Sequence, residues 1–283
     1  MRSHPPTLQT LTRRMLGAEL GLPKGARILV ATSGGPDSQA LLDVLASLRA
    51  PLGLVVTAQG VDHGLRESAA AELDLAEELA RRLEVPFGRS VLHVAEGANL
   101  QARARAARYE ALGAAAAGAL IATGHHADDR AETVLLRLLR GAGPRGLAAL
   151  PPRAGDRIRP MLRARRADVL AHLERHRIPF ATDPSNRSPR FLRARVRHEL
   201  LPLLSTLSPQ IVAHLCALAD QLVPATEGEP AVALARATQD AMLRLLAHPT
   251  EGGEILLPGG LVLRRGRTQV TKKTKKSAVR EEK

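Results

Sequence analysis

The chain has 283 residues and a formal net charge of +13 at pH 7, which allows one sizeable α/β domain with a smaller appendage and indicates a polyanionic partner. Aromatic residues make up 1% of the chain, which argues against an RNA-binding surface built on base stacking. A single cysteine, Cys216, excludes intramolecular disulfides and Cys-x-x-Cys metal sites. Because no apolar run approaches the roughly 20 residues that cross a bilayer and the amphipathic N-terminus lacks a signal peptide's apolar core, we expect a cytoplasmic protein with no membrane partner.

Strands and helices are predicted to alternate along the first half of the chain. Apolar periodicity predicts helices over residues 7–20, from Pro36 onward, and over 67–83, 99–117 and 127–140, with strands from residue 28 and over 54–58, 85–94 and 119–123. Strands and helices alternating at this spacing predict an α/β fold with a doubly wound parallel sheet. Ligands bind such sheets beyond the carboxyl ends of the strands.

The second half of the chain breaks this alternation at the Gly- and Pro-rich segment Gly141–Gly155. Beyond it we expect a helix over 166–177, a polar loop over 183–190, two or three helices to about 222, a helix over 231–247 and a hairpin over 254–271. The predicted organisation is a catalytic domain over 1–204, a small mostly helical domain with the hairpin over 205–271, and a basic, disordered tail over 272–283.

The most informative segment is Ser33-Gly34-Gly35-Pro36-Asp37-Ser38, between the first strand and its helix. The glycines let a ligand approach the main chain, and Pro36 suits the first turn of a helix. The backbone N–H groups and the helix dipole predict a phosphate site, to which Ser33 and Ser38 add hydroxyl donors and Asp37 a ligand for Mg²⁺. The segment lacks the lysine and spacing of a Walker P-loop and resembles the PP-loop of the ATP pyrophosphatases. That resemblance implies ATP as substrate, with AMP and diphosphate as products.

A second polar segment, residues 124–133, follows the fourth predicted strand with the sequence Gly-His-His-Ala-Asp-Asp-Arg-Ala-Glu-Thr. Asp129 and Glu132 are three residues apart and share one helix face, so they form a candidate site for an ammonium group or a metal. An acidic N-cap would account for Asp128 or Asp129, but it leaves the two histidines and Glu132 unexplained. A zinc site is not favoured, since no fourth ligand of the usual kind stands nearby.

Taken together, the motifs resemble those of the tRNA(Ile)-lysidine synthetase family over about residues 26–204. They occur in that family's order: Ser33–Ser38, Val61–Arg66, Asn99–Arg103 with Arg105, Arg108 and Tyr109, Gly124–Thr133, Arg140–Gly143 with Gly146 and Leu147, Arg159-Pro160, Asp183–Asn186 and Arg193–Leu201. Arg130 stands where a Gln is usual and Ala194 where an Asn is usual. Residues 206–271 resemble the family's first C-terminal segment, whereas the further C-terminal domain of longer members has no counterpart.

This resemblance implies ligation of free L-lysine to the wobble cytidine of a tRNA(Ile) with a CAU anticodon, through an adenylated cytidine. The PP-loop and His63 would bind ATP, and Asp37 would hold Mg²⁺. Arg105, or else Arg108, would meet the charge on the α-phosphate. Asp129 and Glu132 would bind lysine and deprotonate its amine, and His125 and His126 would shape the pocket. The family resemblance also implies a homodimer.

Two rival functions share the PP-loop. A PP-loop tRNA thiolase usually carries paired cysteines, which this chain lacks. A nucleotide-sensing RNA-binding protein without catalysis need not keep Asp37, Asp129 and Glu132 together. The arginine-rich stretches around Arg103–Arg108, Arg163–Arg166 and Arg187–Arg197 fit a surface that contacts phosphates.

Overall fold

The computed structural model describes residues 6–62, 68–92, 97, 100–182 and 191–222, and the backbone of strands at 254–257, 261–264 and 271–272. It divides into two compact units, Met1–Val223 and Pro224–Lys283. Each unit is described by itself.

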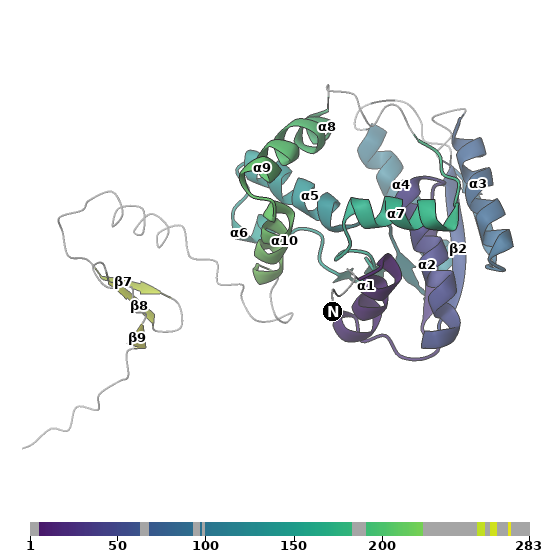
Figure 1. Ribbon diagram of the computed structural model, residues 1–283, viewed down its shortest axis with the longest axis horizontal. Coiled ribbons are helices and arrows are strands. Elements are labelled where there is room, and N and C mark those ends of the chain that lie inside the picture. The colour runs from purple at the N-terminus through teal and green to yellow at the C-terminus, as the bar shows by residue number, and fades with distance from the viewer. Residues whose placement is uncertain are drawn as a thin grey trace, which may run out of the picture. The chain divides into compact units, whose positions relative to one another are not determined.

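The first unit, coloured purple to green in Figure 1, is built on a six-stranded sheet with the order β3-β2-β1-β4-β6-β5. Its strands are β1 (Arg27–Thr32), β2 (Val55–Asp62), β3 (Phe87–Val91), β4 (Leu120–Ala122), β5 (Arg153–Ala154) and β6 (Arg157–Ile158). All neighbouring strands pair in parallel except β5 with β6. The predicted α/β class and the doubly wound, mostly parallel sheet are therefore confirmed.

Helices cover both faces of the sheet. The helical segments are α1 (Leu8–Arg14), η1 (Met15–Glu19), α2 (Pro36–Leu52), α3 (Ser68–Arg82), α4 (Leu100–Ala116), α5 (Ala127–Leu139), α6 (Pro144–Leu147), α7 (Arg166–His176), α8 (Leu192–Arg195), η3 (Val196–Leu200), α9 (Leu201–Leu207) and α10 (Ile211–Gln221). Ile28 and Val30 of β1 pack into a core with α1, α2, α3 and α7, whereas Leu29 and Ala31 face α4. This alternation follows from the two-residue period of a strand, and it makes β1 apolar on both faces.

The strand order reverses between β1 and β4. The chain runs outward from β1 to β2 and β3 and then crosses by α4 to β4, on the other side of β1. The carboxyl ends of β1 and β4 therefore meet at the topological switch point, which is where open α/β sheets bind ligands. The two polar segments singled out by the sequence, Ser33–Ser38 and Gly124–Thr133, follow these two strands.

The segment 141–155 contains structure that the sequence did not predict. It holds the single-turn helix α6 and the strand β5, and β6 follows directly. β6 adds to the sheet beside β4, with Ile121 opposite Arg157 and Ala122 opposite Ile158. Two residues per strand are too few to show a period, so β5 and β6 gave no pattern in the sequence.

Helices α8 to α10 pack on α5 rather than on the sheet. Val196, Val212, Leu215 and Cys216 join Val134 and other residues of α5 in a separate core. The first unit thus continues to Val223, past the predicted boundary at residue 204, and the division of the whole chain into domains stays a prediction. Within the described residues, no single helix is long and apolar enough to cross a membrane; Leu192–Leu207 and Ile211–Gln221 reach that standard only jointly, across a 99° bend.

Strands β7 (Glu254–Leu257), β8 (Leu261–Arg264) and β9 (Thr271–Lys272) form the second unit's antiparallel sheet. β7 and β8 confirm the predicted hairpin, with Leu257 opposite Leu261. The loop predicted over 183–190, the helix predicted over 231–247 and the tail beyond 272 lie outside the described residues.

Arg130, which stands where a Gln is usual in the family that the motifs resemble, links α5 to α10. Its side chain has no exposed surface, and it donates to Ala149 O at 2.9 Å and to Asp220 Oδ1 at 2.5 Å. Asp220 Oδ2 accepts from Arg163, which also binds Glu19. Although burial opposes ionisation, the hydrogen bonds from Arg163 and Arg130 lower the pKa of Asp220. One carboxylate of α10 therefore neutralises a buried arginine of α5.

We predict that Asp220→Ala lowers the free energy of unfolding by about 2–3 kcal/mol, because it leaves Arg130 buried without a counter-charge. The surface variant Asp74→Ala, which removes an exposed pair with Arg89, should cost less than about 1 kcal/mol. Urea titration measures both. In an Arg130→Gln background the Asp220→Ala cost should shrink, because the buried charge is gone; an equal cost in both backgrounds would contradict the role of this pair.

Candidate functional site

The PP-loop closes on itself through its two serines. The Ser38 hydroxyl donates to Gly35 O at 2.9 Å, and the Ser33 backbone N–H donates to Ser38 Oγ at 3.2 Å. Ser38 is buried, and Ser33 is exposed. The Ser38 hydroxyl therefore donates its proton to the loop backbone itself. Its two hydrogen bonds hold the loop in one conformation, and so fix the directions of the backbone N–H groups.

Glycine is required at two points around this loop. Gly34 has φ +73°, and a Cβ there would overlap the backbone carbonyl of Glu72 in α3. Its own carbonyl accepts from Ala181 N at 2.9 Å. Gly124, at the end of β4, sits so close to the first turn of α2 that a Cβ would lie 2.8 Å from Asp37 O. These contacts bring the PP-loop against the start of the second polar segment.

Asp37 presents a carboxylate oxygen with no partner. Its Oδ1 is buried and accepts no hydrogen bond; His126 Nε2 lies 3.6 Å from it, and Arg166 Nη1 lies 4.0 Å from Oδ2. Burial raises the pKa of Asp37, and the charge of Asp129 adds to this, while the positive charges of Arg166 and Arg197 oppose it. No group of three or more His, Cys, Asp or Glu side chains among the described residues forms a metal site, so a cation here would draw its other ligands from substrate or water.

His126, and not an aspartate, caps α5. His126 Nδ1 accepts from the Asp129 N–H at 3.4 Å, and Asp129 Oδ2 accepts from the His126 N–H at 3.1 Å. The proton of a neutral His126 then sits on Nε2, which is fully buried and directed between Asp37 Oδ1 and Asp129 Oδ2, 3.4 Å away. His126 thus connects the PP-loop carboxylate to the carboxylate of α5.

The other acidic and imidazole groups of this segment have different surroundings. Asp128 binds the Arg165 side chain and accepts from the Arg166 N–H at 2.8 Å, and although burial opposes ionisation, these bonds lower its pKa. Asp128 therefore anchors α7. Burial lowers the pKa of His125 to about 4, with Arg159 and two other arginines adding to the effect. His125 is therefore neutral at pH 7, with Nδ1 2.9 Å from Thr123 Oγ1.

Asp129 and Glu132 lie on one face of α5, as predicted, and both are held by arginines. Arg193 bridges them, with 3.0 Å to Asp129 Oδ1 and 3.0 Å to Glu132 Oε2, and Arg197 does the same from the next turn. The Glu132 side chain is 2% exposed. Sequence analysis assigned Arg193 and Arg197 to a phosphate surface; in the structure they neutralise this carboxylate pair.

Two further predicted site residues come from neither polar segment. Arg105 and Arg108 lie on α4, and Arg105 Cζ is 5.2 Å from the centre of the Tyr109 ring. Burial lowers the pKa of Arg108, and Arg105 adds to this. His63 lies outside the described residues.

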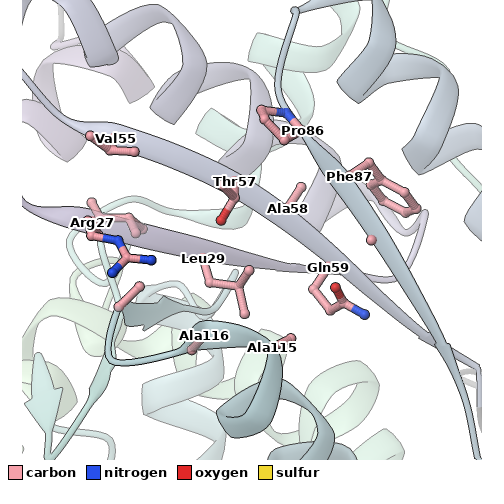
Figure 2. A pocket seen from close by; sticks show the side chains of 13 residues that line it. Arg27, Leu29, Val55, Thr57, Ala58, Gln59, Pro86, Phe87, Ala115 and Ala116 are labelled. Atoms are coloured by element: carbon pink, nitrogen blue, oxygen red, sulfur yellow. The ribbon is translucent and has the colours of Figure 1, made fainter.

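A cavity of about 290 Å³ lies elsewhere, where β1, β2 and β3 meet the end of α4 (Figure 2). Its lining includes Arg27, Thr57 and Gln59 and the small residues Ala115 and Ala116, which leave the space unfilled. Because Arg27 begins β1 and Ala116 ends α4, the cavity lies toward the amino ends of the strands, and it is not the phosphate site.

The chain was compared with known proteins. A PP-loop domain family model matches residues 8–204. The chain is 37% identical to a tRNA(Ile)-lysidine synthase of Geobacter sulfurreducens, over 86% of this chain and 53% of that protein. It is 40% identical to the enzyme of the same name from Thermobifida fusca, over 78% of this chain and 70% of that protein. It is 42% identical to the tRNA(Ile)-lysidine synthase of Pseudomonas aeruginosa, over 68% of this chain and 45% of that protein.

Among solved structures, the U34-tRNA thiolase NcsA of Methanococcus maripaludis superposes with a TM-score of 0.65 at 18% identity, over 78% of this chain and 80% of that one. This likeness supports the fold. The chain spans about half the length of several of the curated relatives that it matches.

We predict that Gly34→Ala destabilises the protein by at least about 2 kcal/mol, because φ is positive and the new methyl group meets the Glu72 carbonyl. Gly35→Ala is the matched control: there φ is −75° and a Cβ would lie 3.5 Å from Ser33 Oγ, an ordinary contact. Thermal unfolding compares the two. Equal stability of the two variants would show that the loop does not depend on the α3 contact.

Proposed function

The chain belongs to the tRNA(Ile)-lysidine synthase family of PP-loop proteins, and from this premise we propose that it ligates free lysine to the wobble cytidine of tRNA(Ile) with a CAU anticodon, in the cytoplasm. One observation carries the proposal: a phosphate-binding loop and a carboxylate pair meet at one sheet edge, joined by His126 within 3.6 Å of Asp37 and 3.4 Å of Asp129. Such an edge brings ATP and a cationic amino acid together.

The proposed reaction has two steps. The 2-carbonyl oxygen of cytidine attacks the α-phosphorus of ATP, and diphosphate leaves. The lysine ε-ammonium loses one proton, its nitrogen attacks C2, and AMP leaves with the former carbonyl oxygen. The nitrogen then loses a second proton and keeps one. The sum is lysidine, AMP and diphosphate, and the change converts an AUG-reading anticodon to one that reads AUA.

ATP is proposed to bind with its phosphates on the PP-loop N–H groups at the start of α2, where the helix dipole favours negative charge. Asp37 fits a role as magnesium ligand, because its Oδ1 is a buried hard oxygen donor without a hydrogen bond. A magnesium ion held there would neutralise phosphate charge. Arg105, with Arg108 as second choice, is proposed to meet the charge on the α-phosphate, and His63 to contact the nucleotide.

Lysine is proposed to bind at Asp129 and Glu132. These carboxylates already receive hydrogen bonds from Arg193 and Arg197, so an ammonium group must replace some of those donors. Asp129 is the better placed to bind or deprotonate the amine, since it also adjoins His126, whereas Glu132 is wholly surrounded. His125, neutral at pH 7, is proposed to line the adenylate pocket without adding charge.

The thiolase alternative is not favoured. Cys216, the one cysteine of the sequence, is buried in the core between α5 and α10 and donates to Ala127 O at 3.4 Å. Burial raises the pKa of its thiol, the opposite of what a sulfur-transferring nucleophile requires. A homodimer remains a proposal that rests on the family alone.

We predict that wild-type protein incorporates radiolabelled lysine into unmodified tRNA(Ile) with a CAU anticodon, and that Asp37→Asn lowers the rate at least about 100-fold. The exposed Asp74→Asn serves as control. Labelled-lysine incorporation and diphosphate release are measured side by side. Wild-type protein that binds ATP and tRNA without incorporating lysine would refute the proposed function.

We predict that Asp129→Asn raises the KM for lysine about tenfold or more, as loss of one charge-assisted contact requires, while tRNA-dependent diphosphate release continues. Glu199→Gln is the control. Glu199 forms an exposed pair with Arg195, on the helical segment that also carries Arg193 and Arg197. A normal KM for lysine in the Asp129 variant would remove this residue from the lysine site.

A further inference from the structure

Three arginines gather near Tyr109 beside the end of β6. Arg157 Cζ lies 4.7 Å and Arg105 Cζ 5.2 Å from the centre of the Tyr109 ring. Arg159 is the third; it follows β6 directly after Ile158, and Tyr109, Arg157 and Arg105 all lie close enough to influence its pKa. We call Arg105, Arg157 and Arg159 the β6 arginine cluster.

Arg159 is buried and only partly satisfied. The residue is 7% exposed; its Nη1 donates to Pro151 O at 2.5 Å, and its Nε has no partner. Burial lowers the pKa of Arg159, and the neighbouring charges of Arg157 and Arg105 lower it further. A buried guanidinium in this state carries a desolvation cost that a bound anion would offset.

Two other buried or half-buried arginines near the site have counter-charges: Arg130 reaches Asp220, and Arg197 reaches Glu132. Among the described residues, no carboxylate lies within 4.0 Å of Arg105 or Arg159, and Arg157 reaches only the exposed Asp156, at 3.8 Å. A purely structural arginine would account for the bond to Pro151, but not for three cations brought together. The cluster has the composition of an anion site.

The position of the β6 arginine cluster on the sheet indicates which anion it would bind. β6 pairs with β4 and β4 with β1, so Arg159 leaves the same sheet edge two strands from the PP-loop, about 10 Å away at the usual strand spacing. The PP-loop supplies its own N–H groups for ATP phosphates. His125, at the end of β4, lies between the two sites, and Arg159 is close enough to lower its pKa.

We propose that Arg157 and Arg159 bind a backbone phosphate of the tRNA, and so place the target nucleotide beside His125. This inference rests on the proposed function, which supplies the polynucleotide. The guanidinium groups of Arg105 and Arg157 both contact the Tyr109 ring, which helps to orient them. The site reads no base; it fixes the register of the strand, as phosphate contacts do.

The test measures binding of tRNA(Ile) transcript and of ATP separately, by fluorescence anisotropy over a range of salt concentrations. We use full-length wild type, Arg157→Gln, Arg159→Gln and Arg159→Lys. Arg153→Gln is the matched control, because Arg153 lies exposed in β5 of the same hairpin and donates only to Gly155 O. It removes the same charge a short distance away.

Arg157→Gln and Arg159→Gln should each weaken tRNA binding about tenfold and reduce the slope of log Kd against log salt by about 1. ATP affinity should stay within twofold of wild type, and Arg159→Lys should restore part of the tRNA affinity. Arg157 is half-exposed, so its variant reports on binding even if the Arg159 variants fold poorly.

If the Arg157 and Arg159 variants lost ATP affinity and kept tRNA affinity, the cluster would be assigned to ATP and the inference overturned. The inference would also be overturned if these variants bound tRNA as tightly as the control Arg153→Gln. Lysine incorporation by wild type tests the proposed function independently. Wild type that incorporates lysine while the Arg157 and Arg159 variants bind tRNA normally would leave the function standing and refute only the phosphate site.

Discussion

The contact between Gly124 and the first turn of α2 is the constraint on which the site depends. A Cβ at residue 124 would lie 2.8 Å from Asp37 O, so only glycine lets the start of α5 approach the start of α2 this closely. That approach places His126 between Asp37 and Asp129. Two helix N-termini, each favourable to negative charge, thereby face one another at the switch point of the sheet.

Charge compensation then divides the polar side chains into groups with different roles. Asp128, Asp220 and Glu132 are each bound by arginines. These three ion pairs hold α7, α10 and η3 against α5. Asp37 and Arg159 are the opposite case, since each retains a buried polar atom without a partner. Burial of an unpaired polar atom opposes stability, so a ligand that bound either atom would offset that cost.

Much of the fold followed from local patterns, whereas the partners within the site did not. The apolar run before Ser33 and the helical period after Pro36 predicted the β1–PP-loop–α2 unit, and the spacing of Asp129 and Glu132 placed them on one face. The pairing of Glu132 with Arg193 joins residues 61 apart, and no local period carries such information. The sequence offered Asp128 or Asp129 as an acidic N-cap, whereas the cap is His126, a residue type that is unusual in this position.

The edge of the sheet presents different chemistry at three strands in spatial order. N–H groups and a carboxylate follow β1, a neutral imidazole follows β4, and the guanidinium groups of Arg157 and Arg159 lie at the end of β6. An ATP molecule needs the first, and a polyanionic strand needs the last. A cytosine between them carries no charge of its own, so the uncharged His125 suits that position. The strand order β1-β4-β6 thus sets the order in which ATP, base and backbone would meet the protein.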